Sequence, residues 1–250
     1  MIEFKSKSDK ILRIDDEHVV VFDDFRNVKI RGRKNKAKLI FADPPFGINF
    51  RGNLNTYHRT PDAISYVEVP KEEYPKFIKE LVKWCYNALD EDGSMWLVSG
   101  WNNLRHVLDA VEDVGFTQLN HVIWKYQFGV YTRRRFTTSH YHLLLLVKDE
   151  KNYTFNKIEK YCEDVWVIKR PYQYGVETAG NELPDELVER CILTSSNEGD
   201  LVIDPVLGSG TTMRVCLKLK RKCLGIEINP SLEKRIKEKV GLHLFLKESL

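Results

Sequence analysis

The chain has 250 residues, and its charges nearly cancel: 39 Lys and Arg stand against 36 Asp and Glu, for a formal net charge of +3. A chain of this length with 42% hydrophobic residues can bury a core without covalent cross-links. These values exclude a disordered tail protein, a collagen-like fibre and a disulfide scaffold. The near-neutral balance weighs against a histone-like binder held by bulk charge but leaves room for a local basic groove.

Strand-like and helix-like segments alternate along the chain, which predicts an α/β domain. The expected strands are 19–22, 38–42, 95–98, 121–124, 143–147, 201–203 and 223–226. The expected helices are 71–89, 104–114, 185–193, 211–219 and 231–240, with a turn at 90–93 after the first of them. We find no internal repeat, so we expect one domain over residues 1–250 with a short target-recognition insert at 149–181.

The termini and the cysteines indicate the cellular setting. The first residues contain no apolar stretch of signal-peptide length, and the longest apolar run, Leu143 to Val147, is too short to span a bilayer. The five cysteines show neither CxxC pairing nor metal-ligand spacing. We therefore expect buried thiols, a cytoplasmic location, no membrane partner and no metal.

A glycine-rich motif, Asp204-Pro205-Val206-Leu207-Gly208-Ser209-Gly210-Thr211-Thr212, follows a buried strand and opens a helix. Its glycines let a ligand approach the backbone, and a helix N-terminus with hydroxyl side chains suits an anionic group. Glu227 ends the next strand, where an acid can accept hydrogen bonds from ribose hydroxyls. No phosphate-binding lysine follows, which excludes a P-loop. A tight strand-to-helix turn with a solvent-facing Glu remains the alternative.

A second motif, Asp43-Pro44-Pro45-Phe46-Gly47, also follows a buried strand. The two prolines fix the backbone and remove two N–H donors, so the turn offers acceptors beside a flat ring. That combination suits a planar ring that carries an NH₂ group. The spacing by itself is equally consistent with a rigid turn capped by an aspartate.

Together the motifs resemble those of the S-adenosylmethionine-dependent amino-methyltransferases of nucleic acids, whose catalytic motif is D/N/S-P-P-Y/F. The catalytic motif comes first, as in the permuted class usually called beta. The resemblance extends from about Val19 to Val240 and implies a Rossmann-like fold with a mostly parallel seven-stranded sheet and helices on both faces. It implies S-adenosyl-L-methionine as cofactor, held by Asp23, Asp24, Asp204, Pro205, Leu207, Gly208, Ser209, Gly210, Thr211, Thr212 and Glu227.

The resemblance also implies a mechanism at an exocyclic amine, N4 of cytosine or N6 of adenine. Asp43 would accept a hydrogen bond from the amine, the carbonyl of Pro44 or Pro45 would accept the other N–H, and Phe46 would stack on the base. The freed lone pair would then attack the sulfonium methyl in line, mostly through positioning and electrostatics. The base would have to leave a duplex or come from a single strand. No cysteine lies in a Pro-Cys context, which argues against methylation of ring carbon C5.

The choice of base and of nucleic acid rests on weaker signals. Phe46 and the segment 177–187 favour cytosine N4, whereas Asp43 in place of the Ser of Ser-Pro-Pro enzymes keeps adenine open. DNA is the first expected substrate; structured RNA such as ribosomal RNA and a catalytically silent binding protein remain alternatives, and a homodimer is open. We expect a basic, aromatic-lined face around Asp43, formed by the basic stretch 29–38 and by Lys125, Phe128, Tyr131, Arg133, Arg134 and Arg135.

Overall fold

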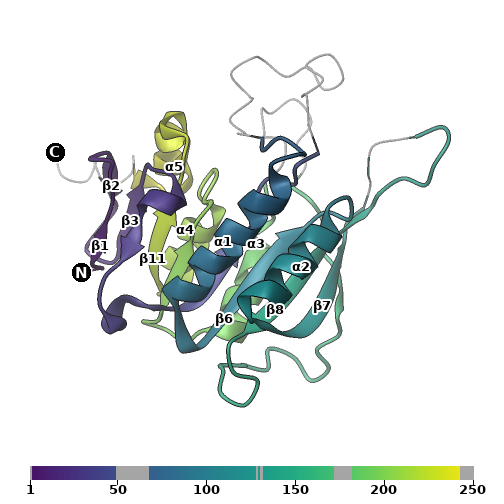
Figure 1. Ribbon diagram of the computed structural model, residues 1–250. Coiled ribbons are helices and arrows are strands. Elements are labelled where there is room, and N and C mark those ends of the chain that lie inside the picture. The colour runs from purple at the N-terminus through teal and green to yellow at the C-terminus, as the bar shows by residue number, and fades with distance from the viewer. Residues whose placement is uncertain (1, 49–67, 128, 130–131, 172–181, 243–250) are drawn as a thin grey trace.

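The computed structural model describes residues 2–48, 68–127, 129, 132–171 and 182–242. Within these ranges a nine-stranded sheet carries helices on both faces (Figure 1). In spatial order its strands are β2 (Ile11–Arg13), β3 (His18–Val21), β11 (Lys222–Ile226), β10 (Leu201–Asp204), β5 (Ala37–Ala42), β6 (Leu89–Ser99), β8 (His140–Val147), β7 (Thr117–Lys125) and β9 (Val165–Val167). A two-stranded ribbon of β1 (Phe4–Lys5) and β4 (Lys29–Ile30) lies beside it.

The sheet is mostly parallel, as expected, with β8 and the edge strand β2 running against the others. Seven of the strands are those expected from the sequence. The edge strands β2 and β9 raise the number to nine among the described residues. Each has three residues, and only the middle one is buried. Strands this short have too little periodicity to be recognised in the sequence.

Helices of the described residues cover both faces of the sheet. The helices α1 (Tyr74–Ala88) and α2 (Leu104–Val114) lie in front of the sheet in Figure 1, and α3 (Asp185–Ser195) and α4 (Thr211–Leu219) lie behind it. The short helix α5 (Glu233–Lys239) packs on the α3–α4 side. Alternate residues of β5 enter the two cores: Ile40 and Ala42 face α1, and Leu39 and Phe41 face α3 and α4.

The expected helices 104–114 and 211–219 are confirmed at both ends. The expected turn at 90–93 is wrong, because α1 passes directly into β6 at Leu89. The acids that suggested a turn are paired instead: Lys38 on the neighbouring strand β5 contacts both Asp90 and Asp92. An ion pair between adjacent strands therefore allows a charged segment to belong to the sheet.

Four of the five cysteines are buried, as expected, but Cys162 is exposed. Its position in the irregular segment before β9 explains the difference, because that segment carries its side chains on the surface of the sheet rather than inside it. Within the described residues, no helix combines the length and apolar character needed to cross a membrane.

Candidate active site

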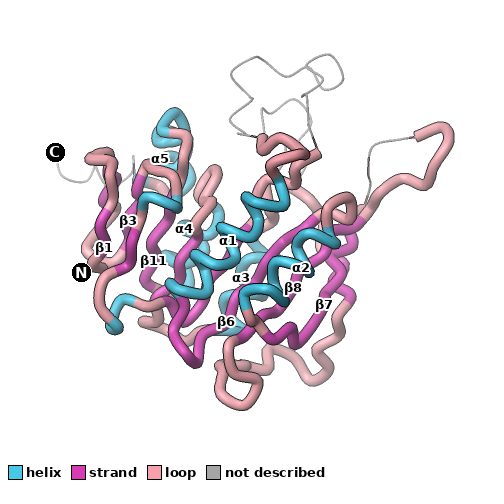
Figure 2. The backbone as a smooth tube through the Cα atoms, in the orientation of Figure 1, coloured by secondary structure: helices cyan, strands magenta, loops and turns pink. Residues whose placement is uncertain are grey.

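The parallel strands bring the two sequence motifs to one edge of the sheet. Asp43 follows β5, Asp204 ends β10 and Glu227 follows β11, and β10 lies between the other two. Because neighbouring strands are about 4.8 Å apart, three acids at the carboxyl ends of adjacent strands must share one site. Figure 2 shows that loops gather at this edge, from which the loop of residues 132–139 projects.

Asp204 holds the glycine-rich turn together. Its buried carboxylate accepts hydrogen bonds from the Val206 amide (3.0 Å) and from Oγ1 of Thr212 (2.6 Å). Burial raises the pKa of Asp204 to about 7, the two hydrogen bonds oppose that rise, and Glu227 adds to it. Both ends of the turn are thus tied to one side chain in the strand that precedes it.

The turn is close-packed on β11. The Leu207 amide donates to the carbonyl of Ile226 (2.8 Å), and a Cβ at Gly225 would lie 2.4 Å from Cδ2 of Leu207. Gly208 (φ +58°) and Gly210 (φ +91°) adopt the left-handed conformation that favours glycine. A Cβ at Gly208 would meet only the carbonyl oxygen of Val206 at 4.0 Å, so there is space beside this residue.

Glu227 faces this turn. Its buried carboxylate accepts hydrogen bonds from the amides of Gly208 (2.7 Å) and Asn229 (2.8 Å). Burial nevertheless raises its pKa to about 7. A carboxylate has about four lone-pair sites, so Glu227 retains acceptor capacity for hydroxyl donors beyond these two amides.

A buried lysine from α5 ties the turn to a distant part of the chain. Nζ of Lys239 donates to Oγ of Ser209 and to Oγ1 of Thr211, both at 2.8 Å, and pairs with Glu182 at 3.2 Å. Arg235 contacts the same carboxylate at 2.9 Å. Sequence reasoning missed this contact, because the residues involved are up to 57 positions apart and no local pattern marks α5 as a partner of the turn.

The Asp43 motif is held from two sides. Nδ2 of Asn103, at the start of α2, donates to the carbonyls of Phe46 (2.6 Å) and Gly47 (3.0 Å). The Gly47 amide donates to Oε1 of Glu68 (3.0 Å). Burial, reinforced by Asp204, raises the pKa of Asp43 to about 7, while the charge of Arg170 acts in the opposite direction. Asp43 therefore lies within electrostatic reach of both the cofactor-type turn and Arg170.

A group of aromatic rings continues from Phe46 across the sheet. Phe46 meets Tyr141 edge-on, with centroids 5.2 Å apart, and Tyr141 in turn contacts Trp124 (5.7 Å) and Tyr126 (5.4 Å). Arg170 packs against the rings of Trp124, Tyr126 and Tyr141. Tyr141 and Arg170 were not expected from the sequence. Trp124 near the end of β7 and Tyr126 just after it, two positions apart, were the signal that could have indicated a shared face.

Asp23 and Asp24 lie at the end of β3, but their carboxylates already have structural partners. Asp23 accepts hydrogen bonds from Ser6 and Asn27, and these bonds lower its pKa against the effect of burial. Asp24 caps the turn at 25–27 and pairs with Arg26. Their role as cofactor contacts stays a prediction.

The residues expected to bind substrate differ in where they lie. Arg133, Arg134 and Arg135 are exposed on the projecting segment, next to Phe136, which is 99% exposed. Lys125 is half-buried and donates to the Tyr126 carbonyl (2.7 Å). Phe128 and Tyr131 lie outside the described residues. Whether these residues contact substrate stays a prediction.

The basic stretch 29–38 does not lie around Asp43, contrary to expectation. It precedes β5, whose carboxyl end leads to Asp43, so it lies at the opposite, amino edge of the parallel strands. The direction of β5 decides this, because the basic stretch ends at the second residue of this strand and the motif follows its last residue.

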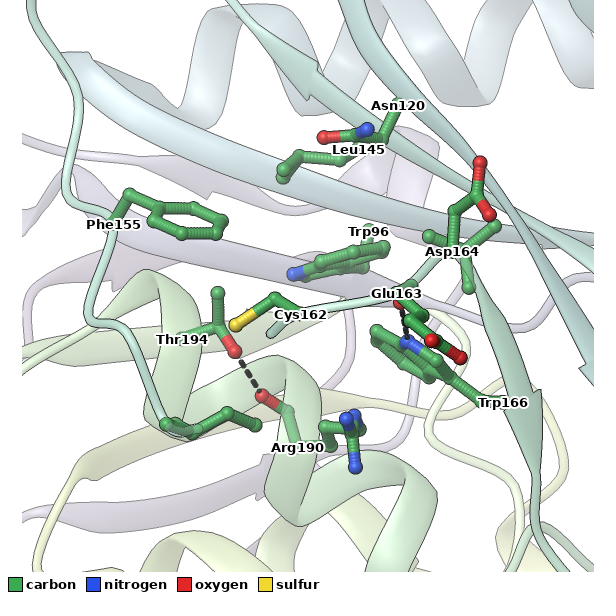
Figure 3. Close-up of a pocket in the computed structure, with 12 residues that line it drawn as sticks. Trp96, Asn120, Leu145, Phe155, Cys162, Glu163, Asp164, Trp166, Arg190 and Thr194 are labelled. Carbon is green, nitrogen blue, oxygen red and sulfur yellow. Dashed lines mark hydrogen bonds between the residues drawn. The ribbon is translucent and has the colours of Figure 1, made fainter. Parts of the chain in front are cut away.

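A separate pocket lies on the α3 face, away from this site (Figure 3). Trp96, Trp166 and Phe155 contribute rings to it; Trp166 donates to the Glu163 carbonyl (2.8 Å) and Thr194 to the Arg190 carbonyl (2.7 Å). The described part of the expected insert, 149–171, thus supplies β9 and a wall of this pocket.

The described residues contain no group of three or more His, Cys, Asp or Glu side chains that could hold a metal ion.

The comparisons with known proteins agree with this geometry. The family described as DNA methylase matches residues 37–238. The chain is 31% identical to the DNA adenine methyltransferase YhdJ of Escherichia coli (strain K12), over 76% of this chain and 71% of that protein. It is 29% identical to the type II methyltransferase M.HpaI of Haemophilus parainfluenzae, over 83% and 69% respectively.

Two solved structures share the fold at low identity. The cytosine-N4-specific PvuII DNA methyltransferase aligns with a TM-score of 0.67 at 17% identity, covering 88% of this chain and 85% of the other. The M1.HpyAVI complex with S-adenosylmethionine aligns with a TM-score of 0.63 at 22% identity, covering 82% and 89%. The chain therefore belongs to the N6/N4 DNA methylase family and is an S-adenosylmethionine-dependent DNA amino-methyltransferase, acting on adenine N6 or cytosine N4.

Proposed function

We propose that this enzyme transfers the methyl group directly to N4 of a cytosine that has left the DNA stack, with Asp43 to Phe46 holding the base. The observation that carries the proposal is the parallel pairing of β5 and β10, which places Asp43, the residue after β5, beside Asp204 at the end of β10. It brings the motif that would hold the amine next to the turn that would hold the methyl donor, as in-line transfer between two bound molecules requires.

The residues of the turn fit S-adenosylmethionine. Glu227 is a buried acceptor suited to ribose hydroxyls, and the space beside Gly208 lets a ligand reach the backbone. Asp204 fixes the turn, in which Pro205, Leu207, Ser209, Gly210, Thr211 and Thr212 complete the proposed cofactor site. When bound, the cofactor supplies an electrophilic methyl group on a positively charged sulfur.

At the base, the ionised Asp43 accepts a hydrogen bond from the exocyclic amine, and the carbonyl of Pro44 or Pro45 accepts the second N–H. These acceptors hold the nitrogen in a pyramidal geometry, so that its lone pair is no longer delocalised into the ring and can point towards the methyl group. They also stabilise the positive charge that develops on nitrogen during transfer. Phe46 stacks on the base, and Asn103 keeps the motif in place through the two carbonyls that it contacts.

Cytosine is favoured by Phe46 at the fourth motif position and by the pattern of 177–187, of which 177–181 lie outside the described residues. Adenine N6 is the second candidate, favoured by the 31% identity to a DNA adenine methyltransferase. Tritium transfer from labelled cofactor to single-stranded DNA, duplex DNA and ribosomal RNA, followed by nucleoside mass spectrometry, separates these possibilities. We expect N4-methylcytosine in DNA. N6-methyladenine would overturn the choice of base, and labelling confined to RNA would overturn the choice of DNA.

Lys239→Met should raise the Kd for S-adenosylmethionine about tenfold, because two hydrogen bonds that position the turn are lost. Glu182 keeps Arg235 as a partner, so the fold should persist. Isothermal titration calorimetry measures the effect. Lys237→Met is the matched control, since Lys237 lies on the same helix but pairs with Glu233 instead of the turn. Equal affinity in the two variants would show that Lys239 does not position the cofactor turn.

The exposed arginines of the projecting segment should bind phosphates. Replacing Arg133, Arg134 and Arg135 by Gln should weaken DNA binding and reduce the slope of log K against log salt by up to about 2 for single strands. Fluorescence anisotropy across a salt series measures the slope. The matched control replaces Arg31, Arg33 and Lys34 by Gln at the opposite edge, and this should leave the slope unchanged. If the control changes the salt slope more than the arginine replacement does, DNA binds at the amino edge of the sheet, which contradicts our proposal.

A further inference from the structure

Arg170 occupies an unusual position beside the catalytic motif. Its guanidinium carbon lies 4.6 Å from the centroid of Tyr126, 5.1 Å from that of Tyr141 and 5.8 Å from that of Trp124. Tyr141 is the ring that contacts Phe46 edge-on. A cation packed against three rings is stabilised by their negative faces, so the charge can remain in a partly buried place without a carboxylate.

The backbone of Arg170 is fixed as firmly as its side chain. The Arg170 amide donates to Oε1 of Gln127 (2.8 Å), and Nε2 of Gln127 donates to the Arg170 carbonyl (3.1 Å). Two residues earlier, the Ile168 amide donates to Lys125 and the Ile168 carbonyl accepts from Trp124. These bonds extend the pairing of β7 beyond β9 and hold the arginine over the aromatic face.

Most of the hydrogen-bonding capacity of this arginine is available to a ligand. A guanidinium has five N–H donors in one plane. Within the described residues, the side chain of Arg170 makes one hydrogen bond, from Nη2 to the Tyr141 hydroxyl (3.2 Å), and no ion pair. Its ring partner Tyr141 contacts Phe46 of the motif, and its charge opposes the rise in the pKa of Asp43, which together place Arg170 beside the proposed site for the base.

We propose that Arg170 is a specificity-determining residue that donates hydrogen bonds to the acceptors next to the target amine, N3 and O2 of cytosine, while Asp43 accepts from the amine. This inference rests on the proposed function. The edge of cytosine presents a donor followed by two acceptors, whereas adenine presents a donor followed by a single acceptor, N1. An acid and a planar array of donors side by side therefore complement cytosine more fully. Arg170 also stabilises the ionised form of Asp43 through its charge.

A cycle that combines one protein change with one atom change in the substrate tests the contact. The substrates are DNA strands with cytosine or 3-deazacytosine, in which C–H replaces N3, at the target position. Arg170→Gln should lower kcat/KM on cytosine about 10- to 100-fold, as expected for hydrogen bonds from a charged group. Replacing cytosine by 3-deazacytosine should lower kcat/KM of the wild-type enzyme by a similar factor. The same replacement should lower kcat/KM of Arg170→Gln little further.

The pH profile gives a second readout. Loss of the positive charge should move the acidic limb of kcat to higher pH, because burial and Asp204 then raise the pKa of Asp43 unopposed. Arg170→Lys should restore part of the shift. Arg190→Gln is the matched control, since Arg190 also packs on a tryptophan, Trp166, at 5.0 Å, but lies in the separate pocket.

If the losses of kcat/KM caused by Arg170→Gln and by 3-deazacytosine multiply, the two changes act independently and the inference is overturned. An unchanged kcat/KM in Arg170→Gln on cytosine would overturn it as well. Failure of the proposed function is recognised separately, because Asp43→Asn would then transfer methyl groups as fast as the wild type. The affinity for S-adenosylmethionine should be the same in the wild type, Arg170→Gln and Arg190→Gln.

Discussion

Asp43→Asn should reduce kcat by about three orders of magnitude, the upper part of the range for a group that supports proton and charge transfer in the transition state. The amide keeps one oxygen that can accept from the amine, but it lacks the negative charge that stabilises the positive charge developing on nitrogen. The affinity for S-adenosylmethionine should change little, since Asp43 lies in the neighbouring motif. Tritium transfer measures kcat, and calorimetry measures cofactor binding.

The same substitution should not lower the melting temperature at pH 8. Burial raises the pKa of Asp43 to about 7. A carboxyl group whose pKa is raised in the folded state loses stability as the pH rises through that value, so a neutral amide removes an unfavourable buried charge. Asp109→Asn is the control, since Asp109 is an exposed residue of α2 with Arg105 as partner. Retention of more than a tenth of kcat in Asp43→Asn, with the protein folded, would contradict the assignment.

Glu227→Ala should raise the Kd for S-adenosylmethionine about 10- to 100-fold, because a charged acceptor for ribose hydroxyls is lost together with two bonds that shape the turn. Glu227→Gln should have a smaller effect, since its side-chain oxygen can still accept one hydrogen bond. Calorimetry with the cofactor measures both values, and DNA binding without cofactor should be unchanged.

Thermal unfolding separates a binding role of Glu227 from a structural one. Its pKa is raised to about 7 by burial, so its contribution to stability is present at low pH and declines as the pH rises through 7. Glu227→Gln should therefore match or exceed the wild-type melting temperature at pH 8, with the difference shrinking near pH 5. Glu198→Ala, in an exposed turn, provides the control. A Glu227→Ala variant that binds the cofactor normally would remove this residue from the proposed site.

Much of the fold could be predicted because its signals are local. The buried strands β5 and β10 are short apolar runs, and α2 and α4 have helical periodicity between residues that start and end them. The two motifs each follow a strand directly, and parallel strands place their carboxyl ends together. Asp43, Asp204 and Glu227 could therefore be assigned to one edge from the sequence alone, with the cofactor class implied by the family resemblance.

Only the tertiary structure decided what surrounds those acids. Phe46, Tyr141 and Arg170 meet because the spatial order of the strands brings distant segments to one face, and Lys239 reaches Ser209 because α5 packs behind the turn. The basic stretch 29–38 was misplaced for the same reason, since composition records a charge but not the edge on which it lies. Turns and periodicity act over a few residues, whereas these contacts depend on strand order and direction, which the core of the whole chain determines.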